Sequence, residues 1–291
     1  MPVCGSGIWL WAVSEGERES LRARSVREPA SKLSPMCGRY AVTADPDELV
    51  KEYDIDDLFA GLPGPDYNVA PTAAVPAVFE RKVKETGEVR RRLAPLVWGL
   101  VPSWSKQASG GARMINARVE SVAEKPAFRR AFSLRRCILP ADGFYEWYLP
   151  HEARRDGAGP GSKVKKQPFF IHRADGSRLA MAGIYEIWRD PTRDRDDDDA
   201  WLRTCSVITT RATDAAGHVH DRMPMVIRRE VIDRWLDPEL SDAQAALDLL
   251  SVTDADQLEA YAVSTAVGNV RNNDRSLLEP IETDDEPATL I

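Results

Sequence analysis

The sequence is poor in the residues that metal sites and disulfide scaffolds require. Its 291 residues include four cysteines and four histidines, and the cysteines have neither zinc-site spacing nor a disulfide-rich pattern. Only His218 and His220 lie close together, and without a second group of ligands they predict no metal site. Cys137 and Cys205 lie beside apolar runs, so we expect ordinary core residues in a protein from a reducing compartment.

Long apolar runs and phosphate-binding loops are absent as well. No stretch reaches the ~18 apolar residues of a membrane-spanning helix, so no contact with a membrane is expected. There is no glycine-rich phosphate loop and no internal repeat, and neither a metal nor an organic cofactor is predicted. Residues 1–35 contain a brief apolar run without a preceding basic segment, which argues against a secretory signal. We interpret them as a disordered extension or as the result of a mis-assigned start.

What the sequence does contain is a series of short strand-like runs with a few helical segments among them. This pattern predicts an α+β, strand-rich fold in a single domain over residues 36–280. Inserts are expected at residues 151–166 and 190–199, and an acidic tail at residues 281–291. The expected strands are 75–79, 89–97, 137–139, 144–148, 168–172, 179–187, 204–210 and 260–263, and the expected helices are 45–50, 126–132, 230–236 and 242–250.

Positive charge is concentrated in the middle of an acidic chain. The net charge is −7, but the segment from Arg81 to Arg173 holds twenty Lys or Arg against eight Asp or Glu. Because a polyanion responds to the local field and not to the total charge, this segment is compatible with nucleic-acid binding. A solvated basic surface is the ordinary alternative.

One short motif carries unusual chemistry. Cys37 directly follows Met36, which could itself be the start residue. If the chain begins at Cys37, that residue carries a free thiol and a free α-amine on adjacent carbons. The amine, whose pKa is ordinarily near ~8, can condense with an aldehyde to an imine, and the thiol can then close a five-membered thiazolidine. An internal cysteine cannot do this because its nitrogen is in an amide.

Four groups of segments hold more aromatic, polar, glycine and proline residues than packing requires. They are Met36–Tyr40; Tyr67–Thr72 with Trp98–Trp104 and Ile115–Ser121; Arg136–Trp147; and His220–Pro224 with Ala266–Asn272. In this order they resemble the SOS-response-associated peptidase family, over nearly the whole chain from Cys37 onward. Proteins of this family shield abasic sites in single-stranded DNA by crosslinking to them.

The resemblance implies a fold, a site and a setting. The implied fold is a mainly antiparallel, barrel-like β domain with flanking helices and a basic groove around the N-terminal cysteine. The implied protein is a monomer that acts on abasic single-stranded DNA during the DNA-damage response, in the bacterial cytoplasm near the nucleoid. The residues that match the family's catalytic positions are Cys37, Asn116, Glu146 and His220, and those that match its DNA-binding positions are Arg39, Asn68, Trp104, Arg118 and Thr209.

The chemistry calls for these residue types independently of the resemblance. An abasic deoxyribose is mostly a closed hemiacetal, so a carboxylate such as Glu146 is needed to move protons while the ring opens. His220 is suited to carry protons near neutral pH, and Asn116 can orient the amine or a sugar oxygen. Arg39 and Arg118 can hold phosphates, and Trp104 can stack on a base. Gly38 and Gly143 are expected either to let the backbone approach the sugar or to lie in turns.

Each of these residues also has an ordinary interpretation, and two other functions remain open. Glu146 could be a strand acid, His220 a core or cap histidine, and Trp104 a core residue. One alternative function is a cysteine peptidase, a hydrolase with Cys37 as nucleophile that could also release residues 1–36. The other is a single-stranded DNA-binding module without catalysis, whose affinity would fall steeply with salt.

Overall fold

The computed structural model describes residues 38–148, 166–250 and 258–283. Cys37, most of the insert at residues 151–166 and most of the acidic tail therefore lie outside the described residues. Among the described residues, no helix combines the length and apolar character needed to cross a bilayer.

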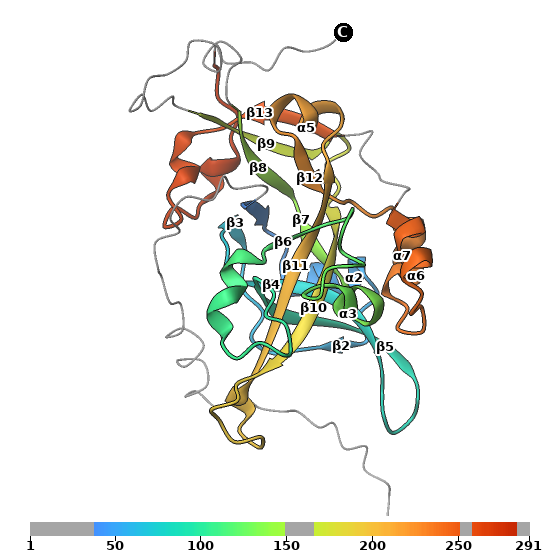
Figure 1. The fold of residues 1–291 in the computed structure, drawn as a ribbon. Helices are drawn as coiled ribbons and strands as arrows, with labels where there is room; N and C mark the ends of the chain where they lie inside the picture. The colour runs from blue at the N-terminus through green and yellow to red at the C-terminus, as the bar shows by residue number, and fades with distance from the viewer. Residues whose placement is uncertain (1–37, 149–165, 251–257, 284–291) are drawn as a thin grey trace, which may run out of the picture. The chain divides into compact units, whose positions relative to one another are not determined.

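Five strands close into a β-barrel (Figure 1). β11 (Trp201–Arg211) pairs with β10 (Leu179–Arg189), β10 with β7 (Arg136–Ala141), β7 with β4 (Ala74–Lys82), and β4 with β5 (Val89–Trp98), each pair antiparallel. The ring is completed by β5, which runs parallel to β11 and places Val97 opposite Thr204. The closed sheet confirms the predicted α+β, barrel-like fold class.

Three short strands extend this sheet beyond the ring. β2 (Asp57–Leu58) runs parallel to β5, β6 (Asn116–Arg118) runs parallel to β11, and β12 (Arg222–Pro224) is antiparallel to β11. β6 and β12 carry residues of the motifs that the sequence singles out. Their strand character was not predicted, because three residues are too few to show a period of two.

A second, antiparallel sheet has the order β13-β9-β8-β1-β3. Its strands are β13 (Leu258–Ala262), β9 (Gln167–Arg173), β8 (Gly143–Tyr148), β1 (Tyr40–Val42) and β3 (Asp66–Val69). The chain passes from the barrel into this sheet at Asp142, the single residue between β7 and β8. The central β8 is thus tied covalently to the barrel and by hydrogen bonds to β1 and β9.

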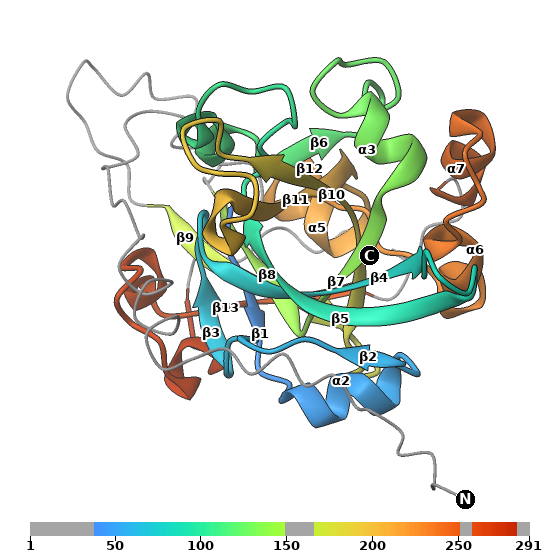
Figure 2. The same ribbon diagram turned by 90° about the horizontal axis from the view of Figure 1, so that it is seen from below.

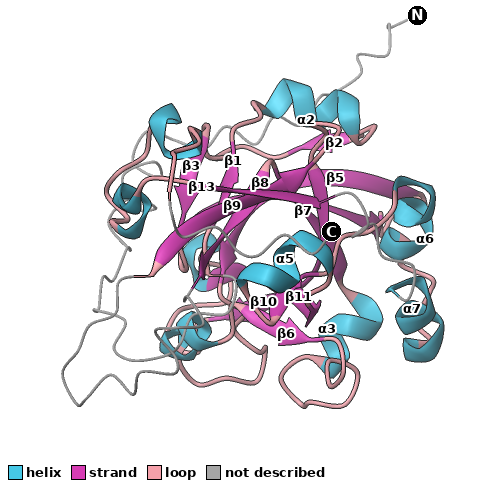
Figure 3. Cartoon of the chain, turned by 90° about the horizontal axis from the view of Figure 1, so that it is seen from above, coloured by secondary structure: helices cyan, strands magenta, loops and turns pink. Residues whose placement is uncertain are grey.

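Short helices surround the strands, as Figures 2 and 3 show from opposite sides. The α-helices are α2 (Pro46–Glu52), α3 (Arg129–Leu134), α5 (Asp214–Val219), α6 (Ile232–Leu236) and α7 (Ala243–Leu250); the 3₁₀ helices are η1 (Ala108–Arg113), η2 (Asp198–Ala200), η3 (Arg229–Val231), η5 (Thr265–Gly268) and η6 (Arg275–Leu278). Asp45 caps α2 by accepting the Glu48 N–H, and Asp242 accepts the Gln244 N–H before α7. These helix starts agree with the sequence-based expectation.

Large apolar side chains fill the barrel, as the alternation of its strands requires. Phe79 and Tyr185 pack with ring centroids 4.7 Å apart, and Trp98 meets Tyr40 of the second sheet edge to face at 5.1 Å. Burial raises the pKa of the Cys137 and Cys205 thiols above the ordinary value. Both cysteines are therefore core residues, as predicted, and are protonated at neutral pH.

All eight predicted strands are present, with ends that shift by a few residues. The predicted insert at residues 190–199 is an exposed turn between β10 and β11, where Asp190 and Asp197 accept backbone N–H groups two residues further on. The aspartates of this insert thus stabilise turns and face the solvent. Among residues 38–148, 166–250 and 258–283, no group of three His, Cys, Asp or Glu side chains is arranged to hold a metal ion.

Candidate active site

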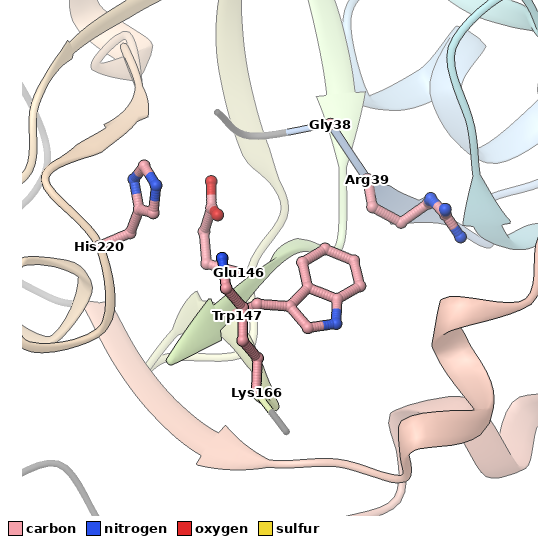
Figure 4. A pocket seen from close by; sticks show the side chains of 6 residues that line it. All are labelled: Gly38, Arg39, Glu146, Trp147, Lys166 and His220. Atoms are coloured by element: carbon pink, nitrogen blue, oxygen red, sulfur yellow. The ribbon is translucent and has the colours of Figure 1, made fainter. Parts of the chain in front are cut away.

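A small cavity of about 270 Å³ lies where the N-terminal end of β1, the strand β8 and the α5–β12 connection meet. Its lining residues are Gly38, Arg39, Glu146, Trp147, Lys166 and His220 (Figure 4). The structure therefore brings Arg39, Glu146 and His220, three residues singled out from the sequence, to one place. Gly38, the residue after Cys37, forms part of the same wall.

Glu146 supplies the cavity with a buried carboxyl group. It lies on β8 opposite Phe169 of β9, and only 1% of its surface is exposed. Figure 4 shows its carboxylate directed between the His220 ring and the backbone at Gly38. A carboxyl group that is withdrawn from bulk water but borders a cavity is the arrangement expected of a general acid or base.

Tight packing explains the glycine at the start of β8. A Cβ at Gly143 would lie 2.4 Å from Phe170 Cζ and 2.5 Å from the Ile171 carbonyl oxygen, both on β9. The expectation that Gly143 lies in a turn is therefore wrong, whereas its approach to the sugar stays a prediction. It is a strand residue that lets β8 and β9 approach, and it contributes indirectly by setting the position of Glu146.

His220 stands at the end of α5 and faces Glu146 across the cavity (Figure 4). Its Nδ1 accepts the backbone N–H of Arg222 at 3.1 Å and lies 3.0 Å from the Asp221 carboxylate. These contacts require opposite roles of Nδ1. The amide is fixed by β12, whereas 86% of the Asp221 side chain is exposed and free to turn, so we favour Nδ1 as acceptor and the proton on Nε2. The Nε2–H is then the group available for proton transfer.

Arg39 is fixed by hydrogen bonds on the side away from Glu146. Its Nη1 donates to Asn68 Oδ1 at 2.7 Å and to the Val267 carbonyl oxygen at 2.9 Å. Its guanidinium lies 6.0 Å from the ring centroid of Trp147. Burial lowers the pKa of Arg39 from its ordinary value, which still leaves it charged at neutral pH. The cavity thus has a cationic side next to an aromatic face.

Asn68, a predicted DNA-binding residue, is buried, with 3% of its surface exposed. Its Nδ2 donates to three backbone carbonyl oxygens, those of Val267, Asn269 and Asn272, at 2.8–3.2 Å. Together with its bond to Arg39, these contacts join β3 to the segment 266–273. Its visible role is to hold Arg39 and this segment in place.

Asn116, Arg118 and Thr209 lie together on neighbouring strands outside the cavity lining. In the parallel pairing of β6 with β11, Asn116 stands opposite Val207 and Arg118 opposite Thr209. Arg118 is exposed, Asn116 is half-buried, and Thr209 is fully buried. Thr209 therefore contributes to the packing between β6 and β11 and not to the exposed surface that carries Arg118.

Arg222 connects this strand pair to His220, although no separate role was predicted for it. Its Nη2 donates to the Thr209 carbonyl oxygen at 2.7 Å, and its guanidinium binds both carboxylate oxygens of Glu120 at 2.5 and 3.1 Å. This ion pair holds the pKa of Glu120 below its usual range. Because the Arg222 backbone N–H binds the His220 ring, anchoring Arg222 also orients His220.

Trp104 lies apart from the cavity lining in the loop after β5, and 67% of its surface is exposed. The next residue, Ser105, accepts the Trp188 indole N–H through its carbonyl oxygen at 2.7 Å, which ties the loop to β10. An indole this exposed does not stabilise the core, so the core interpretation of Trp104 is wrong. Its open face suits stacking with another ring.

Two residues of the cavity were not predicted as site residues. Trp147 belongs to the quoted motif beside Glu146, and its neighbourhood could have indicated it. Lys166 lies at the end of the predicted insert, and no motif around it indicated a place in the site. It comes close to β8 because β9, which begins at the next residue, pairs with β8. Cys37 lies outside the described residues, so its predicted role remains a prediction.

The chain is similar in sequence to a known protein family and to several known proteins. Residues 36–270 match the family model described as SOS response associated peptidase. The abasic site processing protein YoqW of Bacillus subtilis is 36% identical over 245 residues, covering 84% of this chain and 99% of YoqW. YedK of Escherichia coli, with the same description, is 32% identical over 251 residues, covering 84% of this chain and 100% of YedK.

Solved structures show the same fold. A crystal structure of a protein from Bacteroides thetaiotaomicron superposes with a TM-score of 0.66 at 23% identity, covering 84% of this chain and 100% of that protein. A phage-related protein from Bordetella bronchiseptica superposes with a TM-score of 0.56 at 26% identity, covering 79% and 95%.

Proposed function

This chain belongs to the SOS response associated peptidase family, and on that premise we propose that it captures abasic sites in single-stranded DNA covalently through Cys37. The observation that carries the proposal is the cavity in which a buried carboxyl group, Glu146, faces an imidazole, His220. Cys37 immediately precedes Gly38, and Gly38 lines that cavity. A chain that begins at Cys37 therefore offers its α-amine and thiol beside the acid–base pair.

The first step opens the sugar. One member of the Glu146–His220 pair takes the proton of the hemiacetal hydroxyl, and the other gives a proton to the ring oxygen, which yields the aldehyde. The pair suits proton transfer because Glu146 is shielded from bulk water and the His220 imidazole faces it across the cavity.

The second step forms the ring adduct. The α-amine of Cys37 attacks the aldehyde carbon, and the oxygen leaves as water after it is protonated. The thiol then adds to the imine carbon, and its proton passes to the nitrogen. A carbon–nitrogen and a carbon–sulfur bond form, the carbon–oxygen double bond is lost, and one water is released. No oxidant, reductant or metal takes part.

The DNA is held by groups around the cavity. Arg39, beside Trp147, can neutralise a phosphate near the lesion, and the exposed Arg118 can bind a second one. Trp104 offers its open face to a flanking base. The preference for single strands follows, because an abasic sugar must leave a duplex before its anomeric carbon can enter a cavity of about 270 Å³.

The test uses protein that begins at Cys37 and a single-stranded oligonucleotide with one abasic site. We expect an adduct that survives denaturing electrophoresis. Cys37→Ala keeps the α-amine but lacks the thiol, so it should give an adduct only after the imine is reduced with borohydride. A stable adduct from Cys37→Ala without borohydride would refute the thiazolidine.

The state of the N-terminus provides an independent check. Protein that retains residues 1–36 has the Cys37 nitrogen in an amide and should form no adduct. A second experiment expresses the protein from Met1 and measures its intact mass. If residues 1–36 are lost, and if Glu146→Gln prevents the loss, then the same site also cleaves the bond before Cys37, in line with the word peptidase in the family description.

A further inference from the structure

Arginines gather at one end of the closed barrel, away from the cavity. Along each strand of the barrel, alternate residues point inward. Phe79 of β4 and Arg92 of β5 stand directly opposite each other, as do Ile187 of β10 and Arg203 of β11. Arg81 follows Phe79 by two residues on β4 and so continues the same inward-facing row. We call Arg81, Arg92 and Arg203 the arginine rim.

An aromatic floor lies below the arginine rim. Phe79 and Tyr185 close the barrel with ring centroids 4.7 Å apart. Phe59, just after β2, packs against this core, and its ring lies 5.9 Å from the guanidinium carbon of Arg92 and 5.9 Å from that of Arg203. The two guanidiniums therefore share one aromatic ring, which fixes their planes and limits how far apart they can move.

The charge of the arginine rim is only partly neutralised. Arg92 Nε lies 3.2 Å from Asp57 Oδ2, but Asp57 also binds Arg90 at 2.8 Å. Arg81 and Arg203 form no ion pair or hydrogen bond with a carboxylate among the described parts of the chain. Asp198 is near enough to attract Arg203 but forms no ion pair with it among the described residues.

The arginines of the rim also repel one another. Burial, followed by the positive charge of Arg81, lowers the pKa of Arg203 from its ordinary value. A folded chain that keeps these like charges together, with only the shared carboxylate of Asp57 in an ion pair with them among the described residues, resembles a site that awaits an anion. The guanidinium fork matches phosphate oxygens in two parallel hydrogen bonds.

The arginine rim is distinct from the candidate active site. The rim belongs to β4, β5 and β11 beside β2, whereas the cavity lies at β8 and the α5–β12 connection. Figure 1 shows β2 well separated from β8 and α5. No residue of the rim lines the cavity.

We propose that Arg81, Arg92 and Arg203 form a second phosphate-binding site at this end of the barrel. The ligand is a phosphate group with at least two free oxygens directed at the rim. Its source is either a phosphodiester of a DNA strand that extends beyond the lesion or a free phosphate. The DNA source rests on the proposed function, whereas the phosphate chemistry does not.

The first arm of the test measures thermal unfolding with and without inorganic phosphate at constant ionic strength. We expect phosphate to raise the unfolding temperature of the wild type and not that of Arg81→Gln/Arg203→Gln. The matched control is Arg130→Gln/Arg234→Gln, which removes two exposed arginines from α3 and α6 and should keep the phosphate effect. In phosphate-free buffer the rim variant should unfold no earlier than the wild type, since a repulsion has been removed.

The second arm measures the salt dependence of binding to undamaged single strands. For DNA strands long enough to reach the arginine rim, Arg81→Gln/Arg203→Gln loses two phosphate contacts, which should reduce the steepness of log K against log salt by about 1.4. For short DNA strands the slope should not change. A reduced slope for long strands identifies DNA as the source, and a phosphate effect alone identifies a free phosphate. No difference between the rim variant and the control in either arm would overturn the site.

The rim variant also separates this proposal from the proposed function. It should crosslink short abasic oligonucleotides at the wild-type rate, because no rim residue lies in the cavity. If the wild type itself forms no adduct, the proposed function fails, while the phosphate arm still decides the arginine rim.

Discussion

Replacement of Glu146 by glutamine tests whether the buried carboxyl group transfers protons. Glutamine keeps the size of the side chain but cannot gain or lose a proton near neutral pH. Because Glu146 lies in the centre of β8 with 1% of its surface exposed, the amide will stay in the same place between β8 and His220. The variant therefore removes the chemistry while it keeps the shape.

The magnitude follows from what a positioned acid or base contributes. A general acid–base group typically accelerates a reaction by about 10²–10⁴-fold, so we expect the rate of adduct formation by Glu146→Gln to fall by about that factor. Binding to intact single-stranded DNA should not weaken, because the substitution removes a negative charge and no phosphate contact. The exposed Glu124 provides the control, and Glu124→Gln should behave like the wild type.

The assay is the time course of adduct formation on denaturing gels, with protein in excess. A second substrate sharpens it: an oligonucleotide with an open-chain aldehyde does not need its ring opened. If Glu146 acts mainly in ring opening, the open-chain substrate should recover most of the lost rate. A Glu146→Gln rate within about threefold of the wild type on the abasic substrate would refute the assigned role.

Three further outcomes follow from the geometry. Asn68→Ala should destabilise the fold by about 2–4 kcal/mol in chemical denaturation, because it leaves carbonyl oxygens of segment 266–273 without their donor. It should also weaken DNA binding, because Arg39 loses a hydrogen bond that holds it in place. Unchanged stability would contradict the role of Asn68 in holding Arg39 and segment 266–273. Trp104→Ala should leave stability within about 0.5 kcal/mol, since the indole is 67% exposed, while anisotropy should show DNA affinity weaker by about 1–3 kcal/mol; equal affinity would contradict stacking. Burial raises the pKa of Asp66 above its ordinary value in spite of the nearby Arg39, so its ionised form costs stability at pH 7. Asp66→Asn should accordingly be more stable than the wild type at pH 7, and this advantage should vanish as the pH falls below the ordinary aspartate pKa; an advantage that grows on acidification would show the opposite shift.

Long strands were predictable because their own residues carry the signal. Runs such as 179–187 and 204–210 are rich in apolar or β-branched residues, and each became a barrel strand. The closure of the barrel was not predictable in this way. It depends on the parallel pairing of Val97 with Thr204, which are more than a hundred positions apart, and no local pattern specifies such a contact.

Among the strands around the site, the sequence revealed β8, which carries Glu146, but not the three shortest ones. β1, β6 and β12 have three residues each, too few for an alternation to show. They form because longer neighbours, β8 and β11, offer open edges to them. Tertiary context therefore decides the local structure of these short strands.

Identities of the site residues were easier to predict than their positions in the structure. Glu146 and His220 could be picked out because their chemistry suits the reaction and their motifs stand in a specific order. Asn68 shows the limit of this reasoning: an asparagine before a turn suggests a surface contact, but its amide binds carbonyl oxygens about two hundred residues later in the chain. A buried amide that meets distant backbone groups leaves no trace in its own neighbourhood.

Arg222 extends this argument to the catalytic pair. It anchors His220 through its backbone and is itself held by Thr209 and Glu120, so the histidine is oriented by a chain of contacts that begins on β11. Glu146, by contrast, is oriented by the register of β8 against β9. The two halves of the acid–base pair thus rest on different sheets, and their approach depends on the junction at Asp142 between the barrel and the second sheet. We therefore expect substitutions that loosen this junction to slow adduct formation without changing the intrinsic chemistry of either group.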